Sequence, residues 1–410
     1  MPTKTLLRSA EVMHLAARRA AEFGVEIEGP VRFRMERAVA RKDAIVRKIH
    51  EGIHGALHKR DDRIAFLRGE ARFVGEHEID TGEQPLSFAH AIIATGARRA
   101  EPPIAGLDEV EFLTNRTALD LDHLPKSLIV IGGGYVGIEF AQMYARFGSR
   151  VTLLGRNTHL ASGEDPELAD LLSDYLREEG VDVQTGASVG SVRAVGDQKQ
   201  VTFTVDGEQR EVTGAEVLVA TGRVGNTDGL ELGAAGVDAA EHGFIRVDDR
   251  LRTSRPHIWA VGDVKGGWMF THVATYDGPI AALNAVKDEG RMVDYRVVPR
   301  AVFSDPTLAA VGLTEQEAIE RGYDIAVGKV PVSGGRSMAI GDKRGVLKAI
   351  VNRANKEIIG FHILAPHGDD LLHEVVAAMY DHGSIDRIGK SIHVHPTLSE
   401  MVKSAAKAAR

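Results

Sequence analysis

The stretch SLIVIGGGYVGIEFA, residues 127–141, decides the fold of this chain. Residues 127–131 form an almost unbroken apolar run, which is typical of a parallel strand buried on both faces. The glycines at 132–134 predict a turn, and the residues after them predict a helix that ends at Phe147, before Gly148. VTLL, residues 151–154, predicts the next strand. This order of elements indicates an α/β domain with a parallel sheet.

Three glycines around this turn fit the spacing G-x-G-x-x-G, which marks dinucleotide sites when it lies between a strand and a helix. Gly132 would make the tight turn, Gly134 would let a pyrophosphate approach the backbone, and Gly137 would let the helix pack closely on the strand. The first amide groups and the positive dipole end of the helix would bind the phosphates. The motif therefore predicts a dinucleotide site, with an ordinary glycine turn as the plainer alternative.

The residues after the second strand indicate which dinucleotide is bound. An NAD site usually has Asp or Glu there, about 20 residues after the first glycines, to bind the ribose 2′-hydroxyl. This chain has Gly155, Arg156 and Asn157 instead. A guanidinium can pair with a 2′-phosphate, and no carboxylate is present to repel it. The sequence favours NADP, with NAD as the alternative and a solvated loop charge as the plainer interpretation of Arg156.

Composition excludes several classes of function. The 410 residues are 43% hydrophobic and 26% charged, which is typical of a globular protein of more than one domain. The net charge of −8 is spread along the chain, so neither a nucleic-acid face nor a membrane-binding stripe is expected. No membrane helix or signal peptide is apparent, and a cytoplasmic protein is expected. The absence of cysteine excludes disulfides, thiolate metal sites and cysteine nucleophiles within these residues.

Further elements are predicted on both sides of the glycine turn. Two amphipathic helices are expected at 5–23 and about 31–58. Apolar strands that end in Ala-Thr-Gly occur twice, at 91–96 and 217–222, and this weak repeat suggests two related α/β domains. From Pro299 onward, strands alternate with helices at 370–382 and 398–409, which indicates a separate α+β domain.

A rival motif lies in the second of the amphipathic helices. His50, Glu51 and His54 match H-E-x-x-H, in which two histidines bind zinc and the glutamate acts as a base, and His58 extends this spacing by one turn. Gly52 weakens a helix at this point. A chance match is the favoured interpretation, and no metal site is predicted.

The whole chain resembles the flavin-dependent pyridine nucleotide–disulfide oxidoreductases, the family of glutathione reductase, dihydrolipoamide dehydrogenase and mercuric reductase. VTLLGRNTHL (151–160) is most similar to the mercuric reductase branch. The other segments that carry the resemblance are ATGA (94–97), ATGRVGN (220–226), TSRPHIWAVGDV (253–264), PRAVFSDPTLAAVGLTE (299–315) and HVHPTLSE (393–400). The resemblance implies an α/β fold with two Rossmann-like domains for FAD and NAD(P), the first one incomplete, and a C-terminal α+β dimerisation domain.

The resemblance also implies domain borders and a partner. The FAD-binding domain would comprise 1–118 and 245–298, without the N-terminal βαβ unit of the family. The NAD(P)-binding domain would comprise 119–244, and the dimerisation domain 299–410. Two copies of the chain would form a homodimer through that last domain.

Several residues would contact the cofactors by the same resemblance. Asp263 would accept hydrogen bonds from the flavin ribityl hydroxyls, and its place after an apolar strand is where open α/β sheets bind ligands. A loop Asp that caps the next turn is the plainer interpretation. The helix that begins near Thr271 would direct its positive dipole end at the flavin. Further cofactor contacts are implied for Ala94, Thr95, Gly96 and Gly222.

Lys4 and Glu139 resemble the family's ion pair beside the flavin and the nicotinamide. A lysine at a helix N-terminus opposes the helix dipole, which suggests that it pairs with a specific carboxylate. Alternatively, Glu139 is a favourable acid in the first turn of its own helix. Tyr135 resembles the ring that covers the flavin until the nicotinamide displaces it, and its plainer interpretation is a core aromatic residue.

His395 and Glu400 resemble the family's C-terminal active-site pair. In the family this histidine, oriented by the glutamate, is the acid–base group for the substrate thiol across the dimer interface. Such a role needs a group that titrates near neutral pH and a carboxylate that fixes its tautomer. The mercuric reductase branch usually lacks this histidine and ends in a cysteine pair, whereas this chain ends in KSAAKAAR. A small-molecule disulfide is therefore favoured over a metal ion as substrate.

The sequence lacks the family's flavin fingerprint and its Cys-x4-Cys pair, whose second cysteine would fall immediately before Met1. One hypothesis is a start displaced from that of a complete flavoenzyme, which passes hydride from NADPH through FAD to a disulfide. A second is a truncated, non-catalytic NADP-binding homologue, and a third is a mercuric reductase-like enzyme. We expect the first, because the two predicted residue pairs have little purpose without flavin and disulfide.

Overall fold

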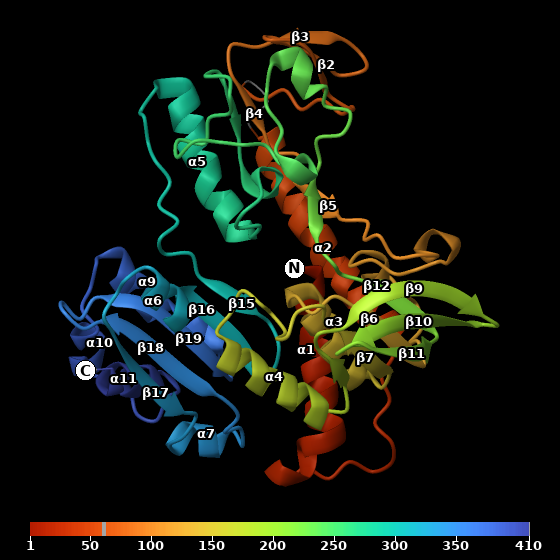
Figure 1. Cartoon of the computed structure of the whole chain (residues 1–410), viewed down its shortest axis with the longest axis vertical. Coiled ribbons are helices and arrows are strands. Elements are labelled where there is room, and N and C mark those ends of the chain that lie inside the picture. Colours follow the sequence, from red (N-terminus) through yellow and green to blue (C-terminus); the bar gives the residue numbers. More distant parts are fainter. Residues whose placement is uncertain (60–62, 410) are drawn as a thin grey trace. The chain divides into compact units, whose positions relative to one another are not determined.

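The computed structural model describes residues 1–59 and 63–409, with the backbone alone at His58 (Figure 1). The chain forms two compact units: Met1–Lys48, Pro102–Thr221 and Val297–Arg410 make up the first, and Ile49–Glu101 and Gly222–Arg296 the second. The expected fold class is confirmed, because both units contain parallel strand pairs and an α+β domain ends the chain. The three predicted domain borders stay predictions.

The first unit contains the parallel sheet that residues 127–141 predict. Its strand order is β12-β6-β7-β8, with β6 (Ser127–Ile131), β7 (Arg150–Leu154), β8 (Asp182–Gln184) and β12 (Glu216–Val219). The connecting helices are α3 (Tyr135–Phe147) and α4 (Pro166–Glu178). All of β6 is buried, since Leu128 and Val130 pack in the same core as these helices, while Ile129 and Ile131 pack in the opposite one.

An antiparallel sheet of order β11-β10-β9 covers that opposite face. Its strands are β9 (Ser188–Val195), β10 (Gln198–Val205) and β11 (Glu208–Gly214). Val201 and Phe203 of β10 are buried against Ile129 and Ile131 of β6. The parallel sheet is therefore covered on both faces, as its apolar strands require.

Helix α1 (Pro2–His14) lies against α3 within the first unit. It continues through a π turn, η1 (Leu15–Arg19), and a 3-10 helix, η2 (Ala20–Phe23), to Gly24. Leu6 and Ala10 are buried, which confirms the apolar face of the predicted helix at 5–23. Helix α2 (Met35–His58) confirms the second expected helix.

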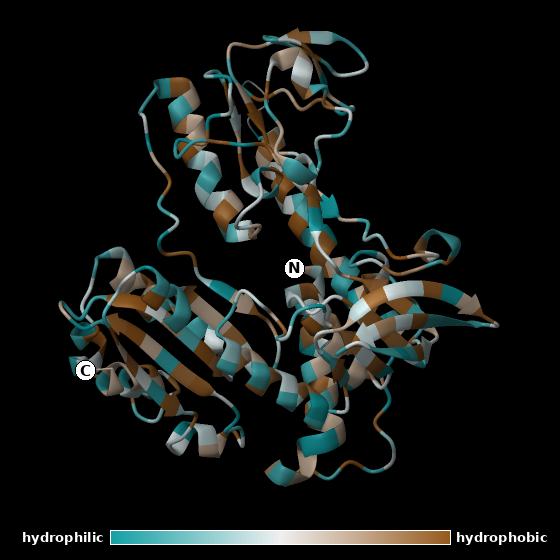
Figure 2. Cartoon of the chain, viewed as in Figure 1, coloured by the Kyte–Doolittle hydropathy of each residue, from teal (hydrophilic) through white to brown (hydrophobic). Residues whose placement is uncertain are grey.

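The C-terminal α+β domain is built on an antiparallel sheet of order β15-β16-β19-β18-β17. The strands are β15 (Arg300–Val302), β16 (Thr307–Gly312), β17 (Ile325–Pro331), β18 (Val346–Asn352) and β19 (Ile358–Ala365). The helices are α6 (Glu315–Glu320), α7 (Gly335–Ala339), α8 (Gly368–Leu371), α9 (His373–Tyr380), α10 (Asp386–Lys390) and α11 (Ser399–Ala408). Figure 2 shows long hydrophobic stretches on β18 and β19, whose residues Leu347, Phe361 and Ile363 are buried.

The second unit contains a parallel pair, β4 (Ala91–Ile93) with β14 (Ile258–Ala260). An antiparallel pair, β5 (Ala97–Arg99) with β13 (Arg223–Gly225), follows directly after the two Ala-Thr-Gly segments. The other elements are β1 (Arg72–Gly75), β2 (Glu78–Asp80), β3 (Pro85–Ser87) and helix α5 (Thr271–Lys287). Short 3-10 helices of the chain are η3 (Leu107–Glu109), η4 (Thr117–Leu119), η5 (Leu232–Ala235), η6 (Glu241–Gly243) and η7 (Gly262–Lys265).

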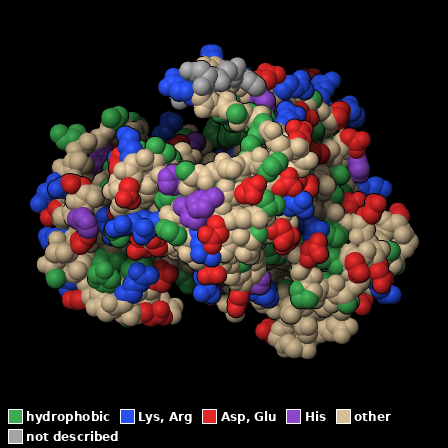
Figure 3. All heavy atoms as spheres, turned by 90° about the horizontal axis from the view of Figure 1, so that it is seen from above, with side chains coloured by type: hydrophobic (Ala, Val, Ile, Leu, Met, Phe, Trp, Pro, Cys, Tyr) green, Lys and Arg blue, Asp and Glu red, His purple; other side chains and the backbone are tan. Residues whose placement is uncertain are grey.

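The surface carries charges of both signs. Figure 3 shows acidic and basic side chains intermixed over one face, as the spread of charge along the sequence predicts. Within residues 1–59 and 63–409, the structure contains no helix that is long and apolar enough to span a bilayer.

Close packing of α11 on β17 depends on a glycine in the strand. A Cβ atom at Gly328 would lie 2.3 Å from the Ala405 carbonyl oxygen. We expect Gly328→Ala to destabilise the domain by about 1–3 kcal/mol, because α11 must shift to relieve this contact. The matched control is Gly190→Ala in β9, where the nearest atom would lie at 3.8 Å. A lower Tm for Gly328→Ala alone supports this packing, and equal Tm values for both variants contradict it.

Candidate nucleotide- and flavin-binding site

The glycine turn has the geometry that the predicted motif requires. Gly132 has a φ of +126°, and a Cβ atom there would lie 2.3 Å from the Ala220 carbonyl oxygen. A Cβ atom at Gly137 would lie 1.8 Å from the Gly132 carbonyl oxygen, so α3 packs directly on the turn. At Gly134, the N-cap of α3, no atom of residues 1–59 or 63–409 lies within 4 Å of the position that a Cβ atom would take. The turn therefore leaves room for a pyrophosphate at the helix N-terminus.

Arg156 is exposed in the loop between β7 and α4. The start of this loop is fixed by a hydrogen bond from the Gly155 N–H to the Gln184 carbonyl oxygen (2.8 Å). Further along, the Ala161 N–H donates to the Gly133 carbonyl oxygen (2.8 Å), which ties the loop to the glycine turn. A guanidinium in this position is accessible to a phosphate bound beside the turn.

Lys4 and Glu139 form the ion pair that the sequence predicts. The Lys4 ammonium lies 2.7 Å and 2.6 Å from the two Glu139 carboxylate oxygens. Glu139 is 5% exposed and also accepts a hydrogen bond from the Phe303 N–H (3.1 Å). The Lys4 ammonium lies 4.1 Å from the centre of the Phe303 ring. Helix α1, helix α3 and the segment after β15 therefore meet at one carboxylate.

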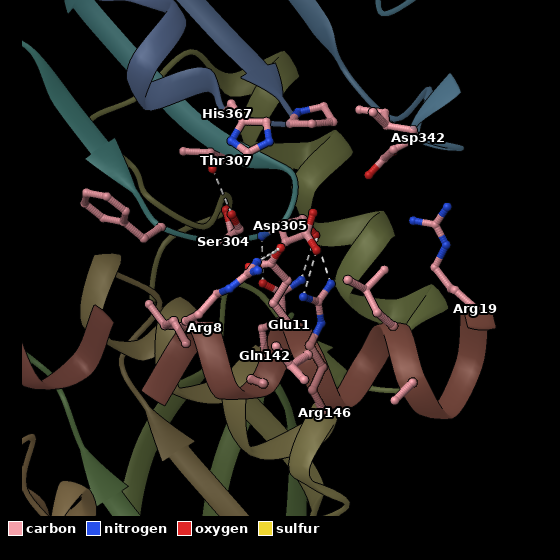
Figure 4. A pocket seen from close by; sticks show the side chains of 18 of the residues that line it. Arg8, Glu11, Arg19, Gln142, Arg146, Ser304, Asp305, Thr307, Asp342 and His367 are labelled. Carbon is pink, nitrogen blue, oxygen red and sulfur yellow. Dashed lines mark hydrogen bonds and ion pairs between the residues drawn. The ribbon is translucent and has the colours of Figure 1, made fainter. Parts of the chain in front are cut away.

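A pocket of about 860 Å³ extends along α1 (Figure 4). Lys4 and Phe303 belong to its lining, so the ion pair borders this space. In the wall, Arg146 contacts Asp305 (2.8 Å), which Arg344 also contacts (3.0 Å). Burial raises the pKa of Asp305, but the two guanidinium groups outweigh burial and hold that pKa below its usual range.

Tyr135, the first residue of α3, has a partner that the sequence did not reveal. Its hydroxyl donates to the Glu164 carboxylate, which also accepts from the Arg300 guanidinium (2.8 Å). Glu164 and Arg300 are both buried. Burial raises the pKa of Tyr135 and that of Glu164, and the nearby Glu164 carboxylate adds to the shift at Tyr135. The phenol is therefore held in its protonated, donating form.

The His395 ring lies beside Glu400, as the sequence predicts. Its Nδ1 atom is 3.0 Å from a Glu400 carboxylate oxygen, and the Thr397 N–H donates to the same carboxylate (3.0 Å). The Thr397 N–H and the His395 ring hold the pKa of Glu400 below its ordinary value. The His395 side chain is 76% exposed. The histidine is thus oriented by an ionised carboxylate and accessible to a substrate.

The predicted flavin residues lie in the second unit. Asp263 follows β14 in η7, and its carboxylate pairs with Arg223 (3.0 Å). The Gly262 N–H, next to Asp263, donates to the carboxylate of the buried Asp277 (3.2 Å). This hydrogen bond fixes the backbone beside Asp263. Helix α5 begins at Thr271 as predicted, and among the described residues no side chain caps its N-terminus by a hydrogen bond. An accessible carboxylate at a strand end and an uncapped helix N-terminus fit a flavin with ribityl hydroxyls.

The first Ala-Thr-Gly segment is held by a residue that follows the second. The Asn226 side chain donates to the Thr95 carbonyl oxygen (2.9 Å), and its backbone N–H donates to that of Gly96 (3.0 Å). The Gly222 carbonyl oxygen accepts from the Ala100 N–H (2.9 Å), while Ala94 lies directly after β4. The predicted contacts of these segments with a cofactor stay predictions.

The H-E-x-x-H residues lie in the second half of α2. Over the part of the chain that the structure describes, no three His, Cys, Asp or Glu side chains gather as a metal site would require. The His58 side chain lies outside the described residues.

Sequence reasoning missed Glu164, Arg300 and Arg223, because their partners are far away along the chain. One signal was available for Arg300. It stands next to the apolar run Ala301–Phe303 in a strand that packs against the core, where a charged residue needs a buried partner.

Comparison with known proteins decides the family. Residues 1–278 match the family described as "Pyridine nucleotide-disulphide oxidoreductase". Residues 298–406 match the dimerisation domain of the same family. The chain belongs to this family. The class of enzyme is therefore an NAD(P)H-dependent flavin oxidoreductase, which uses FAD and a pyridine nucleotide.

The relatives come from several branches of the family. Dihydrolipoyl dehydrogenase of Geobacillus stearothermophilus is 36% identical, with 100% of this chain and 87% of that protein covered. Mercuric reductase of Lysinibacillus sphaericus is 33% identical, and the match covers 99% of this chain and 74% of that protein. The solved structure of the HOCl-induced flavoprotein disulfide reductase RclA from Escherichia coli superimposes with a TM-score of 0.88 at 32% identity. The superposition covers 100% of this chain and 89% of that chain.

Two glycines of the G-x-G-x-x-G motif, Gly134 at the N-cap of α3 and Gly137 within α3, should respond differently to the same substitution. We expect Gly137→Ala to lower Tm and to weaken NADPH binding at least tenfold, because the added methyl group forces α3 away from Gly132. Gly134→Ala should keep the Tm, because its Cβ position is open, and should weaken only the binding of the pyrophosphate. Calorimetric titration and thermal unfolding measure both effects. An unchanged Tm for Gly137→Ala would contradict the close packing.

Proposed function

We propose that this protein oxidises NADPH with bound FAD and passes the electrons to a small disulfide-type substrate. The observation that carries the proposal is the position of Glu139 and Lys4. Glu139 lies about one helical turn beyond the glycine turn on α3, and Lys4 reaches it from α1. The nicotinamide end of a dinucleotide bound at the turn would extend toward this pair. Bound FAD would supply the two-electron carrier between nicotinamide and disulfide.

The chain's own residues would bind and orient the nucleotide. Gly132, Gly134 and Gly137 shape the pyrophosphate site, and Arg156 would pair with the 2′-phosphate of NADP. Lys4 and Glu139 would fix charge beside the reacting ring, and the Glu139 carboxylate is held by the Phe303 amide. On the flavin side, Asp263 would bind the ribityl hydroxyls, and Ala94, Thr95, Gly96 and Gly222 would contact the cofactors.

His395 supports a disulfide-type substrate rather than a metal ion. An imidazole oriented by Glu400 can give a proton to a departing thiolate. The relatives named mercuric reductase favour the second candidate, a metal-ion reductase. The lack of cysteine in the sequence favours a third, a nucleotide-binding protein without thiol chemistry.

The domain borders and the homodimer belong to the same proposal. The predicted dimerisation domain, 299–410, agrees closely with the family match at 298–406, and the proposed FAD domain at 1–118 and 245–298 encloses the NADP domain at 119–244. Ile392 is 99% and Val394 76% exposed beside His395. A second copy that covers these apolar side chains would also bring His395 to the partner's site.

Nucleotide selectivity tests the role of Arg156. We expect Arg156→Ala to weaken NADPH binding about tenfold and to leave NADH binding nearly unchanged, because only NADPH carries the 2′-phosphate. Arg193→Ala, an exposed arginine in β9, is the matched control. Fluorescence titration measures all four affinities. An equal loss for both nucleotides counts against the assignment.

Rapid mixing tests the proposed reaction. With FAD supplied, NADPH should bleach the visible flavin band, and a low-molecular disulfide should then be reduced. We expect His395→Gln to slow the disulfide step at least a hundredfold and to leave flavin reduction unchanged, because only the thiol needs this proton donor. His393→Gln is the neighbouring control. Binding of NADPH without bleaching supports the non-catalytic candidate, and preferential reduction of mercuric ion supports the metal-ion reductase.

A further inference from the structure

One face of α3 lies along the first strand of the dimerisation domain. Tyr135, Glu139, Gln142 and Arg146 share this face, because they are spaced by three or four residues. Glu139 accepts from the Phe303 N–H (3.1 Å), and Gln142 exchanges two hydrogen bonds with the backbone of Asp305 (2.8 and 2.9 Å). Tyr135 reaches the same strand through Glu164, which pairs with Arg300.

Tyr135 is the first residue of this face and lies next to the glycine turn. The glycine turn, where the pyrophosphate would bind, precedes it, and the Glu139–Lys4 pair lies one helical turn beyond it. Tyr135 thus lies along the helix between the proposed pyrophosphate site and the Glu139–Lys4 pair. The position of this side chain therefore bears on access of the nicotinamide.

The partners of Tyr135 hold it firmly. Side-chain exposure is 3% for Glu164 and 5% for Arg300. Tyr135 and Arg300 both donate to the Oε1 atom of Glu164. Its Oε2 atom is buried and has no hydrogen-bond partner among the described residues. The Tyr135 hydroxyl therefore donates to a carboxylate that is part of a buried ion pair, where water does not compete for the hydrogen bond. Arg300 compensates part of the charge of Glu164, although burial still raises the pKa of that carboxyl group.

We propose that the Glu164–Arg300 pair is a latch that holds the Tyr135 hydroxyl and must release it when the nicotinamide binds. Arg300, a residue of the dimerisation domain, is then a positioning residue for the nucleotide site. This inference rests on the proposed function in one respect, the binding of a pyridine nucleotide at the glycine turn. The holding of Tyr135 does not depend on it.

A second buried ion pair provides the control. Lys348 of β18 contacts Asp165 (2.9 Å), the residue next to Glu164, and also Glu315 (2.7 Å). Like the Glu164–Arg300 pair, the Lys348–Asp165 pair joins the loop before α4 to the antiparallel sheet of the dimerisation domain. Lys348 donates to Asp165 (2.9 Å), whereas the Tyr135 hydroxyl donates to Glu164, so the two side chains bind different carboxylates of this loop. Lys348→Met should therefore remove a comparable structural contact and leave the latch intact.

The first experiment is a double-mutant cycle on NADPH affinity. Tyr135→Phe and Arg300→Met should each bind NADPH about fivefold more tightly, because the hydrogen bond that binding must break is removed or weakened. The double variant should bind no more tightly than Tyr135→Phe alone. Lys348→Met should show no such coupling with Tyr135→Phe. Additive effects of Tyr135→Phe and Arg300→Met on affinity would overturn the latch.

The second experiment needs no nucleotide. N-acetylimidazole acetylates accessible tyrosine hydroxyls, and peptide mass spectrometry reports the rate at each site, with the exposed Tyr323 as internal standard. We expect acetylation of Tyr135 at least fivefold faster in Arg300→Met than in the wild type or in Lys348→Met. Glu164→Gln replaces Arg300→Met if the latter fails to fold. Equal rates in all proteins would overturn the latch, whereas a wild type that binds no NADPH would overturn only the proposed function.

Discussion

The buried carboxylate of Glu139 is the contact on which the rest of the site depends. It binds the Lys4 ammonium from α1 and the Phe303 amide from the dimerisation domain, while its own helix carries the glycine turn. A buried carboxylate that loses its partners destabilises a protein by several kcal/mol. Any arrangement that separates α1, α3 and β15 is therefore strongly disfavoured. One charge thus fixes the glycine turn relative to Lys4, and both belong to the proposed nucleotide site.

Opposite charges also organise the boundary between the parallel sheet and the dimerisation domain. Two buried pairs, Arg300–Glu164 and Lys348–Asp165, cross it together with a half-buried pair, Arg146–Asp305. Such pairs add little net stability compared with apolar packing, but they penalise every arrangement in which a charge stays unpaired. They favour one register between the loop after β7 and the sheet. The proposed nucleotide site is consequently built partly from the dimerisation domain, whereas its glycine motif lies in the domain with the parallel sheet.

The sequence predicted the parts of the site that depend on local pattern or on resemblance. The glycine turn, its strand and its helix form where the spacing places them, and Gly132 adopts the positive φ that only glycine tolerates easily. The Lys4–Glu139 and His395–Glu400 pairs, expected from the family, are both in contact. Arg300 and Glu164 escaped prediction because 136 positions separate them, and no periodicity relates two residues so far apart.

The sequence by itself determined the fold class, the glycine turn and the family, because these follow from spacing within a few residues and from apolar periods of individual elements. Only the tertiary structure decided which charges meet. Glu139 could have been an ordinary first-turn acid and Tyr135 an ordinary core ring. Burial makes the difference, since a polar group removed from water must find its partner wherever the packing of distant elements supplies one.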